Sequence, residues 1–178
     1  AKPTQGLSVF YTSLDRRAVE IREIEKMGRK AVDSNQLFID RLEIPADDLI
    51  GDEGRGFEYI LSGMNAERIL IAAEAVGLGR AALERGSLYA KERIVFDRPI
   101  GQNQAIQHPL AECWVALEAA ELLVNRAAWK YDTGQPCGAD ANAAKCFAAE
   151  AGFKACERSV LTHGGFGYAK EYHVERFF

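Results

Sequence analysis

Residues 64–83 read MNAERILIAAEAVGLGRAAL, and this stretch decides the fold. Alanine, leucine, glutamate and arginine dominate it, and these residues have high helix propensities. The same composition extends to both sides, so the sequence predicts a helix from Gly56 to Lys91. Apolar residues recur along this helix at intervals of three and four and predict one buried stripe: Phe57, Ile60, Leu61, Met64, Ile71, Ala75, Leu78, Gly79 and Ala82.

Two charged residues, Glu67 and Arg68, interrupt this stripe. At about 100° per residue, Arg68 falls near its middle and Glu67 near its edge. A buried charge is costly unless it is paired or used. Three explanations are open. Both residues find partners on another helix and form a buried ionic contact, or Glu67 rotates out to solvent. In the third, the carboxylate has a chemical use. Desolvation beside a substrate makes a carboxylate a stronger base.

Helical spacing continues to the end of the chain. Residues 96–103, FDRPIGQN, form a predicted loop after the first helix, and residues 133–136, TGQP, stop the second helix. The glycines at 164 and 165 end the third helix. Long helices with short connections indicate an antiparallel up-down bundle, whose alanines let the axes approach closely. The further predicted helices are Gln104–Asp132, Ala139–Thr162 and one that starts near Lys170.

The pattern before the first helix is that of short antiparallel strands, at SVFY (8–11), AVEIREI (18–24) and QLFIDRLEI (36–44). The composition changes between Pro45 and Gly56, which places a boundary near Gly51. The predicted fold class is therefore mainly α, with a short antiparallel β segment followed by an up-down helical bundle. The predicted domains are residues 1–50 and 51–178.

The composition excludes several classes of function. The net charge is -4, and the lysines and arginines are scattered among acids, which argues against a nucleic-acid partner. No apolar run approaches the roughly 20 residues that cross a bilayer, and no secretory signal begins the chain, so we expect a protein of the bacterial cytoplasm or the mitochondrial matrix. The cysteines lack metal-ligand spacing, so no metal site is predicted, and we expect buried free thiols: Cys113, Cys137, Cys146 and Cys156.

Four stretches, in this order, resemble the acyl-CoA dehydrogenase family, and together they cover essentially the whole chain. The resemblance implies the end of a middle β-domain followed by most of a C-terminal helical domain. It also implies an N-terminal helical domain and further strands before Ala1, and a final helix after Phe178. The stretches are IEKMGRKAVDSNQLFIDRLEIPADDLIGDEGRGF (24–57), MNAERILIAAEAVGLGRAAL (64–83), ERIVFDRPIGQNQAIQHPLAE (92–112) and THGGFGYAKEYHVERFF (162–178).

The resemblance implies FAD-dependent α,β-dehydrogenation of an acyl-CoA thioester. A carboxylate base removes the Cα proton, and a hydride passes from Cβ to the flavin. Family members carry the base either on the helix position matched by Glu67, a type associated with branched or bulky acyl chains, or in a loop that would follow Phe178. Arg68 matches an arginine on the CoA side of the substrate channel, and Phe57 and Asn65 match positions that line it. Ordinary core packing, helix shape or an acid partner would also explain these three residues.

The resemblance also implies cofactor contacts. Arg93 matches an arginine that reaches the flavin pyrophosphate of a neighbouring subunit, with contacts around it at Phe96, Ile100 and Gln104. Gly164 and Gly165 match a turn that approaches the adenosine diphosphate portion of FAD. Without the resemblance, these stretches would be interpreted as a connecting loop and a helix C-cap.

The chain departs from the family pattern at three positions: Val95 stands where a hydroxyl residue is common, Asp97 where glycine is usual, and Leu161 where glutamine is common. Asp97 puts a negative charge near two phosphates, which Arg98 would offset. We interpret His163 as a residue that makes a local hydrogen bond.

The implied assembly is a homotetramer that shares FAD across a subunit interface, takes an acyl-CoA substrate and passes electrons to an acceptor such as a flavoprotein. Acyl-CoA oxidases and flavin monooxygenases use the same fold and stay open as alternatives. A third alternative is a non-catalytic helical scaffold, in which Glu67 and Arg68 form a structural pair.

Overall fold

The computed structural model describes residues 4–178. The chain divides into two compact units, one that ends at Gly63 and one that runs from Met64 to Phe178. In the first unit, β2 (Val19–Glu23) pairs antiparallel with β3 (Asn35–Ile39). β1 (Val9–Phe10) pairs antiparallel with β4 (Leu49–Ile50), which follows the 3-10 turn η1 (Ala46–Asp48).

The predicted third strand, residues 36–44, is shorter than expected. β3 ends at Ile39, and Arg41 then adopts a φ of 51°. A left-handed residue cannot continue a strand, so the apolar residues Leu42 and Ile44 do not extend the ladder. The antiparallel character of the segment is nevertheless confirmed.

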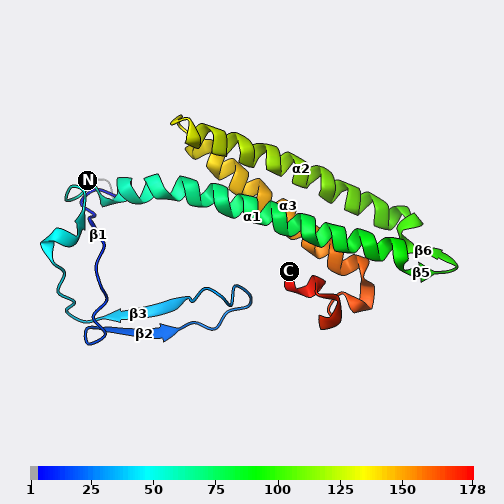
Figure 1. Cartoon of the computed structure of the whole chain (residues 1–178), viewed down its shortest axis with the longest axis horizontal. Helices are drawn as coiled ribbons and strands as arrows, with labels where there is room; N and C mark the ends of the chain where they lie inside the picture. Colours follow the sequence, from blue (N-terminus) through cyan, green and yellow to red (C-terminus); the bar gives the residue numbers. More distant parts are fainter. Residues whose placement is uncertain (1–3) are drawn as a thin grey trace. The chain divides into compact units, whose positions relative to one another are not determined.

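Three long helices make up the rest: α1 (Gly56–Glu92), α2 (Gln104–Asp132) and α3 (Gly138–Thr162). Consecutive helices run in opposite directions, so α1 and α3 run parallel (Figure 1). The predicted up-down bundle is confirmed, with helix ends within one residue of the expected ones.

The predicted fourth helix is wrong. Three short 3-10 turns follow α3: η3 (Gly164–Phe166), η4 (Lys170–Tyr172) and η5 (Val174–Arg176). His173 lies between the last two with a φ of 58°. This left-handed residue prevents the hydrogen-bond pattern of an α-helix from passing through it.

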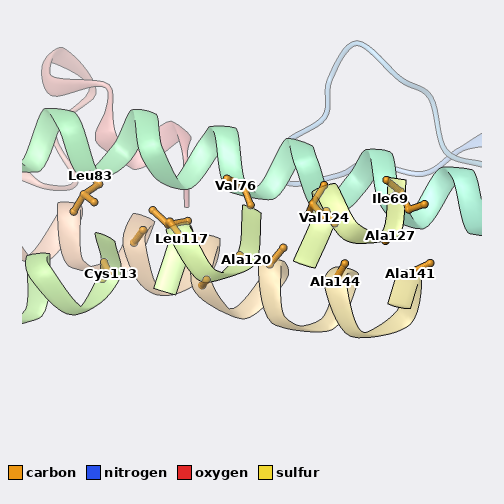
Figure 2. Packing of buried hydrophobic residues seen from close by; sticks show 14 residues of the cluster. Ile69, Val76, Leu83, Cys113, Leu117, Ala120, Val124, Ala127, Ala141 and Ala144 are labelled. Atoms are coloured by element: carbon orange, nitrogen blue, oxygen red, sulfur yellow. The ribbon is translucent and has the colours of Figure 1, made fainter. Parts of the chain in front are cut away.

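The core lies between the three helices, and α1 and α2 supply its larger side chains, whereas α3 supplies only alanines (Figure 2). On each helix the buried positions alternate in steps of three and four residues, as in coiled coils. The cluster consists of Ile69, Ala72, Val76 and Leu83 on α1, Cys113, Leu117, Ala120, Val124 and Ala127 on α2, and Ala141, Ala144, Ala148, Ala151 and Ala155 on α3.

The buried stripe predicted for α1 is largely wrong. Of its members only Gly79 and Ala82 are buried, whereas Ile60, Leu61 and Leu78 are exposed. Apolar residues surround much of this helix, so two neighbouring rows satisfy the same spacing, and the spacing does not distinguish them. Packing against α2 and α3 instead buries the row that contains Ile69, Ala72, Val76 and Leu83.

α1 and α3 pack almost backbone to backbone. A Cβ atom added at Gly79 would lie 3.0 Å from the Cα of Gly152, and one added at Gly86 would lie 3.2 Å from the Cα of Ser159. The two contacts are seven residues apart on both helices, which is about two turns. The parallel helices therefore keep one register along their length.

Ion pairs join the neighbouring helices at their surfaces. Arg80 of α1 donates to Glu121 over 2.8 Å and to Glu118 over 2.5 Å, both on α2. Hydrogen bonds from Arg80 lower the pKa of the Glu121 carboxyl. This fork of a guanidinium and two carboxylates links α1 to α2 across the exposed edge of the core.

Cys113, Cys137 and Cys156 are buried free thiols as predicted, whereas Cys146 is exposed and the prediction for it is wrong. Burial is the main cause that raises the pKa of the Cys156 thiol to about 11, which makes this thiol unreactive.

Within residues 4–178, no group of three or more His, Cys, Asp and Glu side chains is placed to hold a metal ion. Among the helices of this part of the chain, none combines the length and apolarity needed to cross a membrane.

We predict that Gly152→Ala destabilises the bundle by about 1–3 kcal/mol, because the new Cβ would lie 2.6 Å from the carbonyl oxygen of Ala75. Gly77→Ala is the matched control, since its Cβ meets nothing within 4 Å, and it should stabilise the helix by about 0.5–1 kcal/mol. Denaturant unfolding measures both free energies. Equal effects of the two variants would contradict the close approach of α1 and α3.

We predict that the stability difference between the wild type and Asp140→Asn depends on pH. A hydrogen bond from Lys130 and the charge of Arg126 lower the pKa of the Asp140 carboxyl in the folded state. The stabilisation is therefore complete above the unfolded pKa of about 3.9 and disappears as pH falls through the lower folded value. Denaturant unfolding at pH 7 and near pH 3 measures this difference.

Asp132→Asn serves as the control for Asp140→Asn, because Asp132 is exposed and its side chain forms no ion pair among residues 4–178. Removal of this unpaired surface charge should change the free energy of unfolding by no more than about 0.5 kcal/mol. A difference for Asp140→Asn that stays constant between the two pH values would show that the ion pair is not formed.

Candidate functional site

α1 and α3 end at the same end of the bundle (Figure 1). Residues that follow or end these helices line a hollow of about 470 Å³. Four residues predicted to contact the cofactor line it, namely Arg93, Ile100, Gly164 and Gly165. They come from two motifs about 70 positions apart in the sequence, and the parallel packing of α1 and α3 brings them together. The hollow is also lined by Tyr89, Val95, Thr162, His163 and Phe166.

Arg93 is the cation of this hollow. Its backbone is fixed, because its N–H donates to the carbonyl of Tyr89 and its carbonyl accepts from the N–H of Ile100, both over 2.9 Å. Its guanidinium carbon lies 5.9 Å from the centroid of the Phe166 ring. The guanidinium makes no ion pair with any residue in the described range 4–178. Its N–H donors are therefore available to an anion.

The predicted loop at residues 96–103 begins as a tight hairpin. β5 (Ile94–Val95) pairs with β6 (Arg98–Pro99), and the 3-10 turn η2 (Ile100–Gln102) follows. The turn residues Phe96 and Asp97 have φ values of 52° and 60°. Both central residues with positive φ define a type I′ turn, where glycine and asparagine are preferred. A bulky residue such as phenylalanine in this conformation is unusual and costs free energy.

Two predicted cofactor residues do not line the hollow. Phe96 is 93% exposed at the tip of the hairpin, and Gln104 is exposed at the start of α2. Arg98 Nη2 donates to Asn103 Oδ1 over 2.6 Å, and the expectation that its charge offsets that of Asp97 stays a prediction. Asp97 has no ion-pair partner in the part of the chain that the structure describes.

An aromatic cluster that sequence analysis did not identify supports the wall of the hollow. The His163 ring stacks on Tyr89 with centroids 4.2 Å apart, and Tyr172 meets both rings edge to face. His163 Nδ1 lies 2.7 Å from the carbonyl oxygen of Ser159, which confirms the predicted local hydrogen bond. The only signal for this cluster in the sequence is its nearness to the two motifs. Tyr89 lies one turn before Arg93, and His163 directly precedes Gly164.

The candidate base lies elsewhere on the same helix. Glu67 is exposed, and its side chain has no hydrogen-bond or ion-pair partner in the described residues. Arg68 is half-buried and donates to Asn65 Oδ1 over 3.3 Å. A buried Glu67–Arg68 contact is therefore not formed, and Glu67 turns to solvent, as the second interpretation of the sequence expected. Phe57, at the start of α1, is partly exposed.

Glu67 and the hollow are far apart within one chain. A rise of 1.5 Å per residue separates Glu67 from Arg93 by roughly 39 Å along α1. The structure therefore does not bring the predicted base and the predicted cofactor residues into one site.

Residues 54–178 match the family model described as acyl-CoA dehydrogenase, C-terminal domain. The chain belongs to the acyl-CoA dehydrogenase family. This confirms the resemblance that the four sequence stretches carried, whereas the roles of individual residues stay predictions.

Similar proteins support the family assignment. A protein of Bacillus subtilis described as an acyl-CoA dehydrogenase is 40% identical over 172 residues, which cover 96% of this chain and 45% of the relative. Butyryl-CoA dehydrogenase from Megasphaera elsdenii superposes with a TM-score of 0.92 at 32% identity, over 99% of this chain and 46% of that structure. A structure described as PigA with FAD and proline superposes with a TM-score of 0.93 at 27% identity, over 98% and 47% of the two chains.

The chain therefore spans about half the length of the curated relatives it matches. The matched half of the family fold contains both the helix of Glu67 and the hollow beside Arg93.

Proposed function

We propose that the protein is an FAD-dependent acyl-CoA dehydrogenase, and that this chain supplies the base and a surface for the diphosphate of FAD. The observation that carries the proposal is the convergence of Arg93, Ile100, Gly164 and Gly165 on one hollow. The family resemblance assigned these four residues to one cofactor from separate motifs. A structurally similar protein is described as PigA with FAD and proline.

The hollow suits a diphosphate. Arg93 offers a permanently charged group with several N–H donors, which suits phosphate oxygens. No atom lies within 4 Å of a Cβ built at Gly164 or Gly165, so a ligand has room to approach the backbone there. Val95 and Ile100 make part of the wall apolar.

FAD, when bound, supplies the acceptor for the hydride. In this proposal Glu67 accepts the Cα proton of the acyl-CoA thioester on its carboxylate. Arg68, held by Asn65, faces the CoA portion of the substrate, and Phe57 lines the acyl channel. Phe96 and Gln104 are proposed as outer cofactor contacts on the hairpin and on α2.

The separation of Glu67 from Arg93 supports an assembly in which each chain serves two sites. A base roughly 39 Å from the hollow along one helix cannot act on a flavin whose diphosphate lies in that hollow. We therefore propose that Arg93 contacts the cofactor of a neighbouring copy, in a homotetramer, with an electron-accepting flavoprotein as partner. The alternative scaffold function depended on a structural Glu67–Arg68 pair, which the structure does not form.

The visible spectrum of the purified protein tests this function. We expect a flavin spectrum, or uptake of added FAD, and bleaching of that spectrum by an acyl-CoA ester under anaerobic conditions. A protein that stays colourless with added FAD would contradict the cofactor. A flavoprotein that no acyl-CoA ester bleaches would instead favour a monooxygenase on the same fold.

We predict that Glu67→Gln lowers kcat by about 10²–10⁴-fold, because the amide cannot accept the Cα proton. The variant should retain FAD and an unchanged circular dichroism spectrum, since Glu67 is exposed and its side chain forms no hydrogen bond or ion pair in residues 4–178. Steady-state turnover with an acyl-CoA ester measures the effect. Turnover close to that of the wild type would move the base to another carboxylate.

We predict that Arg93→Ala weakens FAD binding by about 10- to 100-fold, because one charged hydrogen-bonding group is lost. Arg85→Ala is the matched control. Arg85 lies on the same helix and also stacks on an aromatic ring, that of Phe177 at 4.8 Å, but does not line the hollow. Fluorescence titration with FAD measures the dissociation constants of both variants. Equal dissociation constants for the two variants would show that the hollow does not hold the diphosphate.

A further inference from the structure

Arg93 and Phe166 continue the register in which α1 and α3 pack. The close contacts Gly79–Gly152 and Gly86–Ser159 are seven residues apart on each helix, and Arg93 and Phe166 lie a further seven residues on. At this third step both helices have ended, and a guanidinium on an aromatic ring takes the place of the backbone contact. The helix packing brings the ends of α1 and α3 together, and the 3-10 turn Gly164–Phe166 then places the Phe166 ring beside Arg93.

The Phe166 ring is held independently of Arg93. Its backbone N–H donates to the carbonyl of His163 over 3.2 Å, and its carbonyl accepts from Ala169 over 3.0 Å. Its ring leans on that of Tyr172, with centroids 5.2 Å apart. Tyr172 in turn contacts Tyr89. The ring is therefore a fixed surface, whereas the arginine side chain above it has several rotatable bonds.

We propose that Phe166 is a positioning residue, which holds the Arg93 guanidinium over the hollow so that its N–H donors face a diphosphate. A cation within about 6 Å of a ring centroid is attracted to the ring face, and guanidinium groups stack there while their edge donors stay free. The ring thus restricts the arginine without occupying its donors. This inference rests on the proposed function, because it concerns the same hollow.

A double-mutant cycle in the protein tests the inference, with FAD affinity measured by fluorescence titration. Phe166→Leu keeps apolar volume but removes the ring face, and we expect it to weaken FAD binding about two- to fivefold. In an Arg93→Ala background the same substitution should leave the dissociation constant unchanged. Phe166→Tyr keeps a ring face at this position, so this variant should bind FAD more tightly than the Phe166→Leu variant does.

The outcomes separate the two proposals. If Arg93→Ala weakens FAD binding but Phe166→Leu weakens it equally in both backgrounds, Phe166 acts on the site without positioning Arg93, and this inference is overturned. If Arg93→Ala itself does not change FAD affinity, the proposed cofactor site in the hollow is wrong. Phe177→Leu is the control, because it removes a ring from beneath Arg85 outside the hollow and should not alter FAD affinity. If Phe166→Leu unfolds the protein, Phe166→Met takes its place in the cycle.

Discussion

The rest of the structure depends on the close approach of α1 and α3, where glycines and alanines allow two backbones to meet. A single Cβ at Gly152 would lie 2.6 Å from a carbonyl oxygen of α1. At these contacts both helices carry glycine or another small residue, whereas the larger core side chains, such as Leu83 and Leu117, come from α1 and α2. The contact fixes the register of two parallel helices, and that register determines which residues meet where the helices end.

The candidate site follows from this register. Arg93 comes directly after α1, and the glycine turn at Gly164 comes soon after α3, so both reach the same end of the bundle. A shift of one helix relative to the other would separate the cation from the turn. The exposed Glu67, about seven turns away along α1, belongs to a different part of the surface, which is why one chain is proposed to serve two active sites.

The sequence predicted the order of the helices and their ends closely, because Gly, Pro and Asn residues mark those ends locally. It did not predict the buried row of α1, since Leu78 and Val76 satisfy helical spacing equally well and only the partner helices distinguish them. Arg93, Ile100, Gly164 and Gly165 were found through motifs. Phe166 and Tyr89 were not, because their contacts join segments that lie far apart in the chain.

An experimental structure of the protein with FAD bound would show directly whether one chain serves two active sites. We expect the FAD diphosphate in the hollow, within hydrogen-bond distance of the Arg93 guanidinium, and the flavin ring of the same FAD near Glu67 of another copy. A diphosphate bound elsewhere, with Arg93 facing solvent, would contradict it.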